Sequence, residues 1–307
     1  MRLTRRAWLA AAGSSAALTI AGGLRRACAA ASGDPIFKTV PASGERLPPV
    51  GIGTARRYQG VAQDALAPLR ETLRVFAAAG GKVIDTAPSY GDAEEVLGGL
   101  LESLALRDSV FLATKVSSTG REAGLAQIEQ SFRNLRSRSI DLIAVHNLQD
   151  AARQLATLRE LKDSGRIRYV GLTTSFSAQH DELAVLIRRE KPDFVQVDYA
   201  LDNRAAASSV LPAAREHGAA VMVNLPFGRN SVFRAVQGRE LPAWAADFDV
   251  RSWAQFFLKY IISHEAVTVA IPGTATSRYA ADNTGAASGR LPDAAARRRM
   301  EAFIDDL

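Results

Sequence analysis

The feature that most constrains the fold of this chain is a short apolar run that recurs eight times along it. The runs cover residues 47–54, 82–87, 110–116, 140–146, 169–174, 193–200, 219–226 and 266–273. Each run is too short for a helix and nearly continuous in apolar character, which is typical of strands that are covered on both faces. We therefore expect eight buried strands.

Segments with helical periodicity alternate with these runs. They cover residues 60–81, 92–104, 124–136, 150–165, 177–190, 207–218, 250–264 and 293–307. Strands that alternate with helices pair in parallel through right-handed crossovers. Eight such units in about 250 residues predict an α/β fold, a closed (β/α)8 TIM barrel that forms a single domain over residues 32–307. The alternative is a doubly wound open sheet, but no Gly-x-Gly-x-x-Gly turn follows a predicted strand.

The first 31 residues have the layout of an export signal. A basic start is followed by an Ala- and Leu-rich middle and by small residues, and Thr-Arg-Arg-Ala-Trp-Leu at 4–9 resembles a twin-arginine signal. We expect the twin-arginine export machinery to recognise residues 1–31, which are then removed, so that the protein is periplasmic or otherwise exported without a membrane span. The alternative is a membrane anchor, but the run 7–24 is rich in Ala, Gly and Ser and would span a bilayer poorly.

This signal carries most of the excess positive charge. The whole chain has a formal net charge of +6, and the five arginines before Ser32 leave +1 for the rest. No basic face is implied, and we expect no nucleic acid partner. Cys28, the only cysteine, falls inside the signal, so the remaining chain has no cysteine nucleophile or cysteine metal ligand, and we expect no metal.

Four titratable side chains follow three successive predicted strands. Asp85 stands at the end of the second apolar run and Tyr90 in the turn after it, while Lys115 and His146 end the next two runs. In a barrel the carboxyl ends of the strands meet at one mouth, where catalytic groups lie. A buried Asp85 or Lys115 would need an opposite charge, so we expect the two to pair.

This pairing predicts acid–base chemistry. An ammonium beside Tyr90 would lower the phenol pKa from about 10, so that Tyr90 could exchange a proton near neutral pH. Asp85 would keep Lys115 charged and oriented. His146 could donate a hydrogen bond to a carbonyl oxygen on which negative charge develops. The set suits delivery of a proton to an oxygen while another group delivers a hydride.

Further motifs accompany these four residues. They are Gly-Ile-Gly-Thr at 51–54, Asp-Thr-Ala-Pro-Ser-Tyr-Gly at 85–91, Glu-x-x-Leu-Gly at 94–98, Thr-Lys-Val at 114–116, Tyr-Val-Gly-Leu at 169–172, Gln196 and Ile-Pro-Gly-Thr at 271–274. With them, the chain from Leu47 to Asn283 resembles the aldo-keto reductase superfamily. The resemblance implies a monomeric barrel that reduces a small carbonyl substrate with NADPH. It also implies a catalytic tetrad with Tyr90 as general acid, made of Asp85, Tyr90, Lys115 and His146.

The resemblance also implies a set of cofactor-binding positions. They are Gly53, Thr54, Thr173, Thr174, Gln196, Asn224, Phe227, Gly228, Gly273, Thr274, Arg278, Asp282 and Asn283. Family members usually have Ser-Asn where this chain has Thr173 and Thr174, and often an aromatic ring where it has Asn224. Two contacts to the nicotinamide are therefore altered here.

The phosphate and adenine ends of the cofactor are expected at the last strand. Gly273 and Thr274 would offer backbone N–H groups to a phosphate at a helix start. Arg278 could meet a 2′-phosphate, which favours NADP, with NAD possible. Asp282 and Asn283 fit the adenine contact of the family.

Two other functions remain open. The altered positions Thr174 and Asn224, together with an exported location, leave open a binding or scaffold role with weak cofactor affinity. Lys115 could instead form a Schiff base in a lyase or isomerase.

Packing roles are expected for several other residues. Residues 228–250 show no clear periodicity and are expected to form a functional loop such as a lid. Trp244 and Trp253 are expected to pack in the core or the lid, and His180 is expected at the surface.

Overall fold

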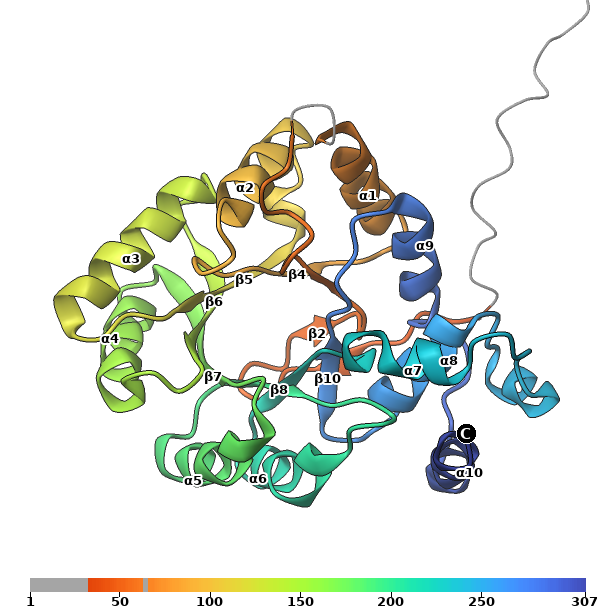
Figure 1. The fold of residues 1–307 in the computed structure, drawn as a ribbon. Helices are drawn as coiled ribbons and strands as arrows, with labels where there is room; N and C mark the ends of the chain where they lie inside the picture. Colours follow the sequence, from red (N-terminus) through yellow and green to blue (C-terminus); the bar gives the residue numbers. More distant parts are fainter. Residues whose placement is uncertain (1–32, 63–65) are drawn as a thin grey trace, which may run out of the picture. The chain divides into compact units, whose positions relative to one another are not determined.

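The computed structural model describes residues 33–62 and 66–307, so the expected export signal lies outside the described residues. Its centre is a parallel sheet in the order β10-β9-β8-β7-β6-β5-β4-β3 (Figure 1). The strands are β3 (Ile52–Gly53), β4 (Val83–Asp85), β5 (Phe111–Val116), β6 (Ile140–His146), β7 (Ile167–Thr173), β8 (Phe194–Asp198), β9 (Ala220–Asn224) and β10 (Val267–Ala270). Each overlaps one of the eight apolar runs, so the expectation of eight buried strands is confirmed.

Two parallel bridges close this sheet into a barrel. Val50 pairs with Ala270, and Gly53 pairs with Gly273. Helices surround the strands (Figure 1), and the principal ones are α1 (Leu66–Ala78), α2 (Ala93–Ser103), α3 (Arg121–Asn134), α4 (Ala151–Asp163), α5 (His180–Glu190), α6 (Val210–Glu216), α8 (Trp253–Ile262), α9 (Ser277–Gly285) and α10 (Ala294–Asp305). The (β/α)8 barrel is therefore confirmed.

Alternation along the strands decides which side chains point into the barrel. The interior apolar cluster includes Val83, Phe111, Leu142, Tyr169, Phe194, Ala220, Met222 and Val269. Two or four residues further along the same strands stand Asp85, Lys115, His146, Thr173 and Gln196. Side chains two positions apart share a face of a strand, so these polar groups also point inward, at the carboxyl ends. The site is thus built on top of an apolar layer.

A hairpin packs against the interior at the opposite end. Strand β1 (Lys38–Thr39) pairs with β2 (Arg46–Leu47) in an antiparallel arrangement. Val40 and Leu47 are fully buried and belong to the interior cluster. Apolar packing therefore fills the amino-terminal end of the barrel and leaves the carboxyl ends for polar groups.

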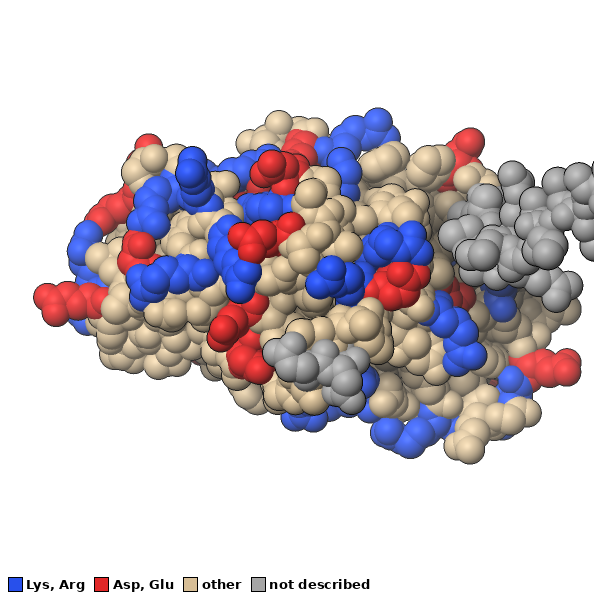
Figure 2. Space-filling model, turned by 90° about the horizontal axis from the view of Figure 1, so that it is seen from above, with Lys and Arg blue, Asp and Glu red and all other residues tan. Residues whose placement is uncertain are grey.

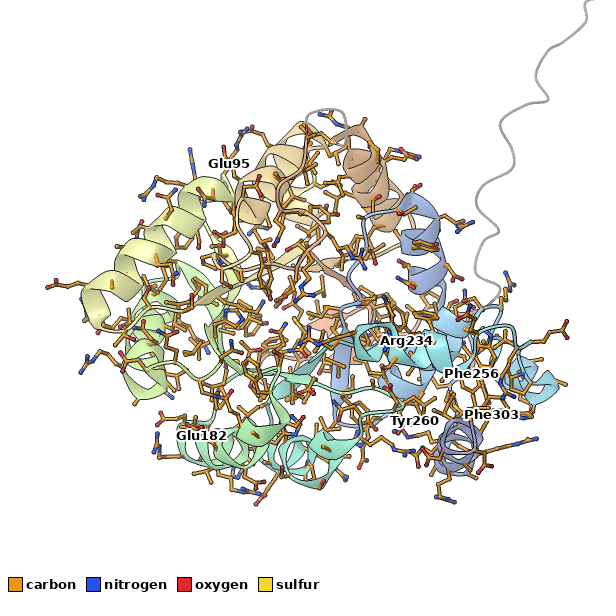
Figure 3. The ribbon with its side chains drawn as sticks, in the orientation of Figure 1. Glu95, Glu182, Arg234, Phe256, Tyr260 and Phe303 are labelled. Atoms are coloured by element: carbon orange, nitrogen blue, oxygen red, sulfur yellow. The ribbon has the colours of Figure 1, made fainter. Side chains whose placement is uncertain are left out.

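Aromatic packing attaches α10 to the outside of the barrel. The ring of Phe303 lies 6.4 Å from that of Phe256 on α8, and Figure 3 shows the two side by side. Trp253 and Trp244 each lie 6.0 Å from Phe303 between ring centroids. Both tryptophans therefore belong to this packed group.

The segment 228–250 contains helical turns, although its sequence shows no periodicity. These are η5 (Gly228–Asn230), α7 (Ser231–Ala235) and η6 (Ala243–Phe248). The fully buried Lys259 of α8 donates to the backbone oxygens of Phe248, Ser288 and Arg290 at 2.7, 2.7 and 2.9 Å. These three bonds hold the end of the segment against α8.

Charges of both signs are mixed on the face drawn in Figure 2, where Lys and Arg side chains lie next to Asp and Glu. This mixture agrees with the net charge of +1 outside the expected signal. Across residues 33–62 and 66–307, no helix combines the length and apolar character that crossing a membrane requires.

Candidate active site

Asp85 and Lys115 form a buried ion pair at the carboxyl ends of β4 and β5. The Nζ atom of Lys115 lies 2.8 Å from each carboxylate oxygen of Asp85 and 2.8 Å from the backbone oxygen of Thr86. The side chains of Lys115 and Asp85 are only 2% and 6% exposed. Gln196 adds a hydrogen bond from Nε2 to Asp85 Oδ1 at 3.0 Å. The ammonium has three protons and three acceptors, so its position is fixed.

Tyr90 and His146 lie beside this pair. The Nζ atom of Lys115 is 5.2 Å from the centroid of the Tyr90 ring. The rings of Tyr90 and His146 are 6.1 Å apart and nearly perpendicular, at 83°. Ser89 Oγ lies 3.3 Å from His146 Nδ1 and orients the imidazole. The four residues expected to be catalytic therefore come together.

A cleft of about 490 Å³ opens over these groups. Its walls are Gly53, Ala55, Arg56, Arg57, Gln59, Asp85, Ser89, Tyr90, Lys115, His146, Asn147, Thr173, Ser175, Gln196, Asn224, Leu225, Pro226, Phe227, Arg229, Asn230, Ile271 and Gly273. The volume is within the range of small-molecule and cofactor sites.

Lys115 lowers the pKa of Tyr90 through its charge and a hydrogen bond, as expected, but the expectation that the pKa falls below its usual value is wrong. Burial raises the pKa of Tyr90 above 10.0, and this effect outweighs the opposing charge of Lys115. The ammonium is already engaged by Asp85, whose own charge further disfavours the phenolate. Tyr90 is therefore a neutral O–H group that can donate a proton.

His146 and Lys115 have fixed charge states at neutral pH. Burial, reinforced by the Lys115 ammonium, lowers the pKa of His146 to about 4, so the imidazole is neutral. Burial is the largest single influence on Lys115 and lowers its pKa, but the charges of Asp85 and Tyr90 and hydrogen bonds to both residues together outweigh burial and raise the pKa. The site thus presents a neutral imidazole and a neutral phenol beside a permanent ammonium.

Three residues expected to hold the nicotinamide end line the cleft together. Thr173 Oγ1 donates to Gln196 Oε1 at 2.7 Å, and Gln196 Nε2 donates to Asp85. Asn224 donates from Nδ2 to the backbone oxygen of Thr174 at 3.2 Å. The Oδ1 atom of Asn224 is buried and has no partner among the described residues, so it remains available as an acceptor.

The side chain of Thr174 is directed away from the cleft. Its hydroxyl donates to Gln179 Oε1 at 2.5 Å and accepts from the backbone N–H of Phe176 at 3.1 Å. The residue is fully buried and is absent from the cleft wall. The reason is strand alternation, since Thr173 points inward and its neighbour therefore points outward. Only the backbone oxygen of Thr174 touches the site, through Asn224.

The glycines of the expected phosphate region lie at the cleft or beside it. Gly53 and Gly273 line it and pair with each other, and Thr54 and Thr274 follow them and are buried. Gly228, after the cleft residue Phe227, has φ of 53°, and a Cβ there would collide with Ser231 and Asp202. Glycine is therefore required in this turn.

The residues expected at the adenine end lie on α9, outside the cleft wall. Arg278 is exposed, and its guanidinium lies 4.9 Å from the Tyr279 ring centroid. Asp282 accepts hydrogen bonds from Ser252 Oγ and Gln255 Nε2. Asn283 is buried and donates to Thr274 Oγ1 at 3.1 Å. The roles of these three residues toward a cofactor stay predictions.

His180 is buried, so its expected place at the surface is wrong. Its Nε2 lies 2.9 Å from Asp198 Oδ1, and Asn203 donates to Asp198 Oδ2 at 2.6 Å. His180 is the first residue of α5, and this first turn faces the end of β8. Asp198 stands four residues after the inward-pointing Phe194 on the same strand, so it lies on the same face. This spacing in the sequence indicates a buried polar group at the end of β8.

Several cleft residues were not expected from the sequence. Arg56, Arg57 and Arg229 line the mouth, and over the described ranges none of their guanidinium groups has an ion-pair partner. Ser89 and Asn147, which flank Tyr90 and His146 in the chain, also line the cleft. Arg229 lies in the turn η5, within the segment 228–250 that was expected to be functional, and the other four lie in loops that follow strands, where sequence periodicity gives no signal.

Residues 49–302 match the model of the Aldo/keto reductase family. The chain belongs to this family. It is an oxidoreductase of the aldo/keto reductase type, and the resemblance that its motifs suggested is confirmed.

Individual relatives agree with this assignment. Methylglyoxal reductase YeaE of Escherichia coli is 31% identical over 271 residues, which are 84% of this chain and 92% of that protein. Aldo-keto reductase YhdN of Bacillus subtilis is 30% identical over 162 residues, 48% of each chain. A crystal structure of an aldo/keto reductase from Klebsiella pneumoniae with NADP and acetate superposes with a TM-score of 0.73 at 25% identity, over 86% of this chain and 94% of that one.

Proposed function

We propose that this aldo/keto reductase reduces an aldehyde or ketone with NADPH and that Tyr90 is the general acid. The observation that carries the proposal is the convergence of a neutral phenol, a neutral imidazole and a paired ammonium at one cleft. Methylglyoxal reductase YeaE, which matches most of the chain, supports a small carbonyl substrate.

Each residue has a distinct role in this reaction. The cofactor would supply a hydride to the carbonyl carbon. Tyr90 would give its proton to the carbonyl oxygen, and the charge of Lys115 would stabilise the phenolate that remains. His146, held by Ser89 Oγ at 3.3 Å, would orient the carbonyl through a hydrogen bond to its oxygen. Asp85 would keep the ammonium charged and in place.

The residues present fit a nicotinamide cofactor. Its carboxamide has two N–H donors, and the free Oδ1 of Asn224 is an acceptor on the cleft wall beside Thr173 and Gln196. The unpaired guanidinium groups of Arg57 and Arg229 would attract its phosphates. The NADP-bound Klebsiella structure supports NADP over NAD.

Calorimetry and kinetics on the purified protein test this proposal. NADPH is expected to bind with micromolar affinity, more tightly than NADH, and its oxidation should follow the addition of methylglyoxal. Absence of binding at millimolar cofactor would support the alternative, a binding or scaffold role on the same barrel.

The Schiff-base alternative is disfavoured by the state of Lys115. An amine attacks a carbonyl only when it is neutral and has a free lone pair. Here the Asp85 carboxylate raises the pKa of Lys115, and the ammonium donates to three acceptors. Borohydride treatment with a carbonyl substrate is expected to leave Lys115 unmodified.

Export and a monomeric state complete the proposal. The basic Thr-Arg-Arg-Ala-Trp-Leu segment supports recognition by the twin-arginine machinery, with a periplasmic or otherwise exported mature protein. Replacing Arg5 and Arg6 together by lysine should retain the protein inside the cell, as cell fractionation would show. Light scattering of the mature protein is expected to give the mass of one chain.

A further inference from the structure

Glu94 is a buried acid that the proposed reaction does not use. It begins the Glu-x-x-Leu-Gly motif, lies in the first turn of α2 and is only 1% exposed. Burial is the largest influence on the pKa of its carboxyl group and raises it. Because a buried acid is less favourable than an apolar side chain unless its contacts compensate, those contacts should explain its presence.

One contact of Glu94 joins α2 to the strand that carries Lys115. Glu94 Oε1 accepts a hydrogen bond from Thr114 Oγ1 at 2.6 Å, and both residues are buried. Thr114 precedes Lys115 on β5, so its side chain points outward to the helices while Lys115 points into the barrel. The bond is short and well formed. It fixes the first turn of α2 against β5.

The motif also brings α2 close to α3. Asn134, the last residue of α3, donates from Nδ2 to Glu94 Oε2 at 3.5 Å. A Cβ atom at Gly98, one turn further along α2, would collide with the backbone of Asn134 and Leu135. Glu94 and Gly98 therefore lie on one face of α2, and glycine permits the close approach that places Glu94 between α3 and β5.

The first turn of α2 continues directly from the turn that carries Tyr90. Ala93 N donates to the backbone oxygen of Tyr90 at 3.2 Å, and Glu94 is the next residue. At the other end of the route, one peptide bond joins Thr114 to Lys115. The Glu94–Thr114 hydrogen bond is thus a short connection between the backbone of Tyr90 and the backbone of Lys115.

We propose that Glu94 is a positioning residue that sets the phenol of Tyr90 against the ammonium of Lys115 through its hydrogen bond from Thr114. The inference rests on the proposed function, in which Tyr90 gives up a proton and Lys115 stabilises the phenolate. Both the Coulomb energy and the proton transfer depend on the separation of these groups, so a small displacement of the turn slows the reaction. Apolar packing has no preferred direction and would hold the turn less precisely.

Thr114→Val tests this inference, because it removes the donor and keeps the shape of the side chain. In single turnovers of NADPH-loaded protein with methylglyoxal, the rate of cofactor oxidation is expected to fall by about 10- to 100-fold. The affinity for NADPH, measured by calorimetry, should equal that of the wild type. Thr114→Ser keeps a hydroxyl and should keep the wild-type rate.

Thr268→Val is the matched control. Thr268 on β10 is also buried, lies outside the cleft wall and accepts a hydrogen bond at Oγ1 from the backbone N–H of Val221 at 3.1 Å. Its loss should lower the free energy of unfolding in urea, as the loss of the Thr114 hydroxyl does. The single-turnover rate of Thr268→Val should match that of the wild type.

The double variant Glu94→Met with Thr114→Val separates positioning from stability. Because both partners become apolar with similar shapes, the double variant should recover most of the free energy of unfolding that Thr114→Val loses. Its rate should stay low, because the directional bond is still missing.

Two results overturn the inference and leave the proposed function intact. One is a Thr114→Val protein with the wild-type rate, and the other is a double variant whose rate recovers together with its stability. A wild-type protein that binds NADPH but does not oxidise it with methylglyoxal contradicts the proposed function, and the inference falls with it.

Discussion

Removing the ammonium of Lys115 should destabilise the protein more than removing both charges of the buried pair. In Lys115→Met, Asp85 keeps one side-chain hydrogen bond, from Gln196, and its side chain is only 6% exposed. Breaking a buried pair in this way lowers the free energy of unfolding by about 3–5 kcal/mol. The double variant Asp85→Asn with Lys115→Met leaves no buried charge, so we expect a coupling energy of about 2–4 kcal/mol in the cycle.

The cycle consists of the wild type, Asp85→Asn, Lys115→Met and the double variant. Urea unfolding of these four proteins without cofactor, at pH 7 and pH 5, measures the coupling energy. Burial already raises the pKa of Asp85 in the wild type, against the opposing charge of Lys115. Removing the cation in Lys115→Met raises this pKa further, so the folded variant takes up a proton that the unfolded chain does not at a higher pH than the wild type. The difference in free energy of unfolding between the wild type and Lys115→Met should therefore become smaller as the pH falls from 7 to 5. The reasoning would be refuted if the two single substitutions lowered the free energy of unfolding additively in the double variant. It would also be refuted if Lys115→Met lost the same free energy of unfolding at both pH values.

Three further predictions concern stability and cofactor affinity. Because burial lowers the pKa of His146 from 6.5 to about 4, the folded protein binds fewer protons than the unfolded chain in this range. The stability present above pH 6.5 is lost as the pH falls to 4, by about 3 kcal/mol, and His146→Gln should flatten this loss in urea titrations. Lys259→Met leaves three backbone oxygens without their donor and should lower the free energy of unfolding by a few kcal/mol, measured in the same way. Asn224→Ala should weaken NADPH binding about tenfold by calorimetry, whereas Thr174→Ser, whose hydroxyl faces away from the cleft, should leave it unchanged.

The barrel and its inward polar groups could be predicted because both follow from periodicity. The spacing from Val83 to Asp85 and from Phe111 to Lys115 places each charged group on the same face as an apolar residue below it. The same alternation places Thr174 on the opposite face from Thr173. The outward direction of the Thr174 side chain could therefore have been predicted from strand alternation. The resemblance to the family instead implied that Thr174 binds the cofactor.

Other features depend on distances that the sequence does not contain. The pKa of Tyr90 depends on the balance between its burial and the nearby charge of Lys115. The ammonium of Lys115 also donates hydrogen bonds to Asp85 and to the backbone oxygen of Thr86. Arg56, Arg57 and Asn147 lie in loops and Arg229 in the short turn η5, where no periodicity shows which side chains point inward. The burial of His180 was not predicted because its partner Asp198 lies at the end of strand β8, eighteen residues further along the chain.

The most direct test of the account is the reduction of a carbonyl by Tyr90→Phe in a single turnover with bound NADPH. The variant lacks only the hydroxyl that is proposed to donate the proton. We expect its NADPH affinity to match that of the wild type and its rate of cofactor oxidation with methylglyoxal to fall by about 10²–10⁴-fold at pH 7. An unchanged rate with cofactor bound would contradict the assignment of Tyr90 as the acid and, with it, the role given to the Lys115–Asp85 pair.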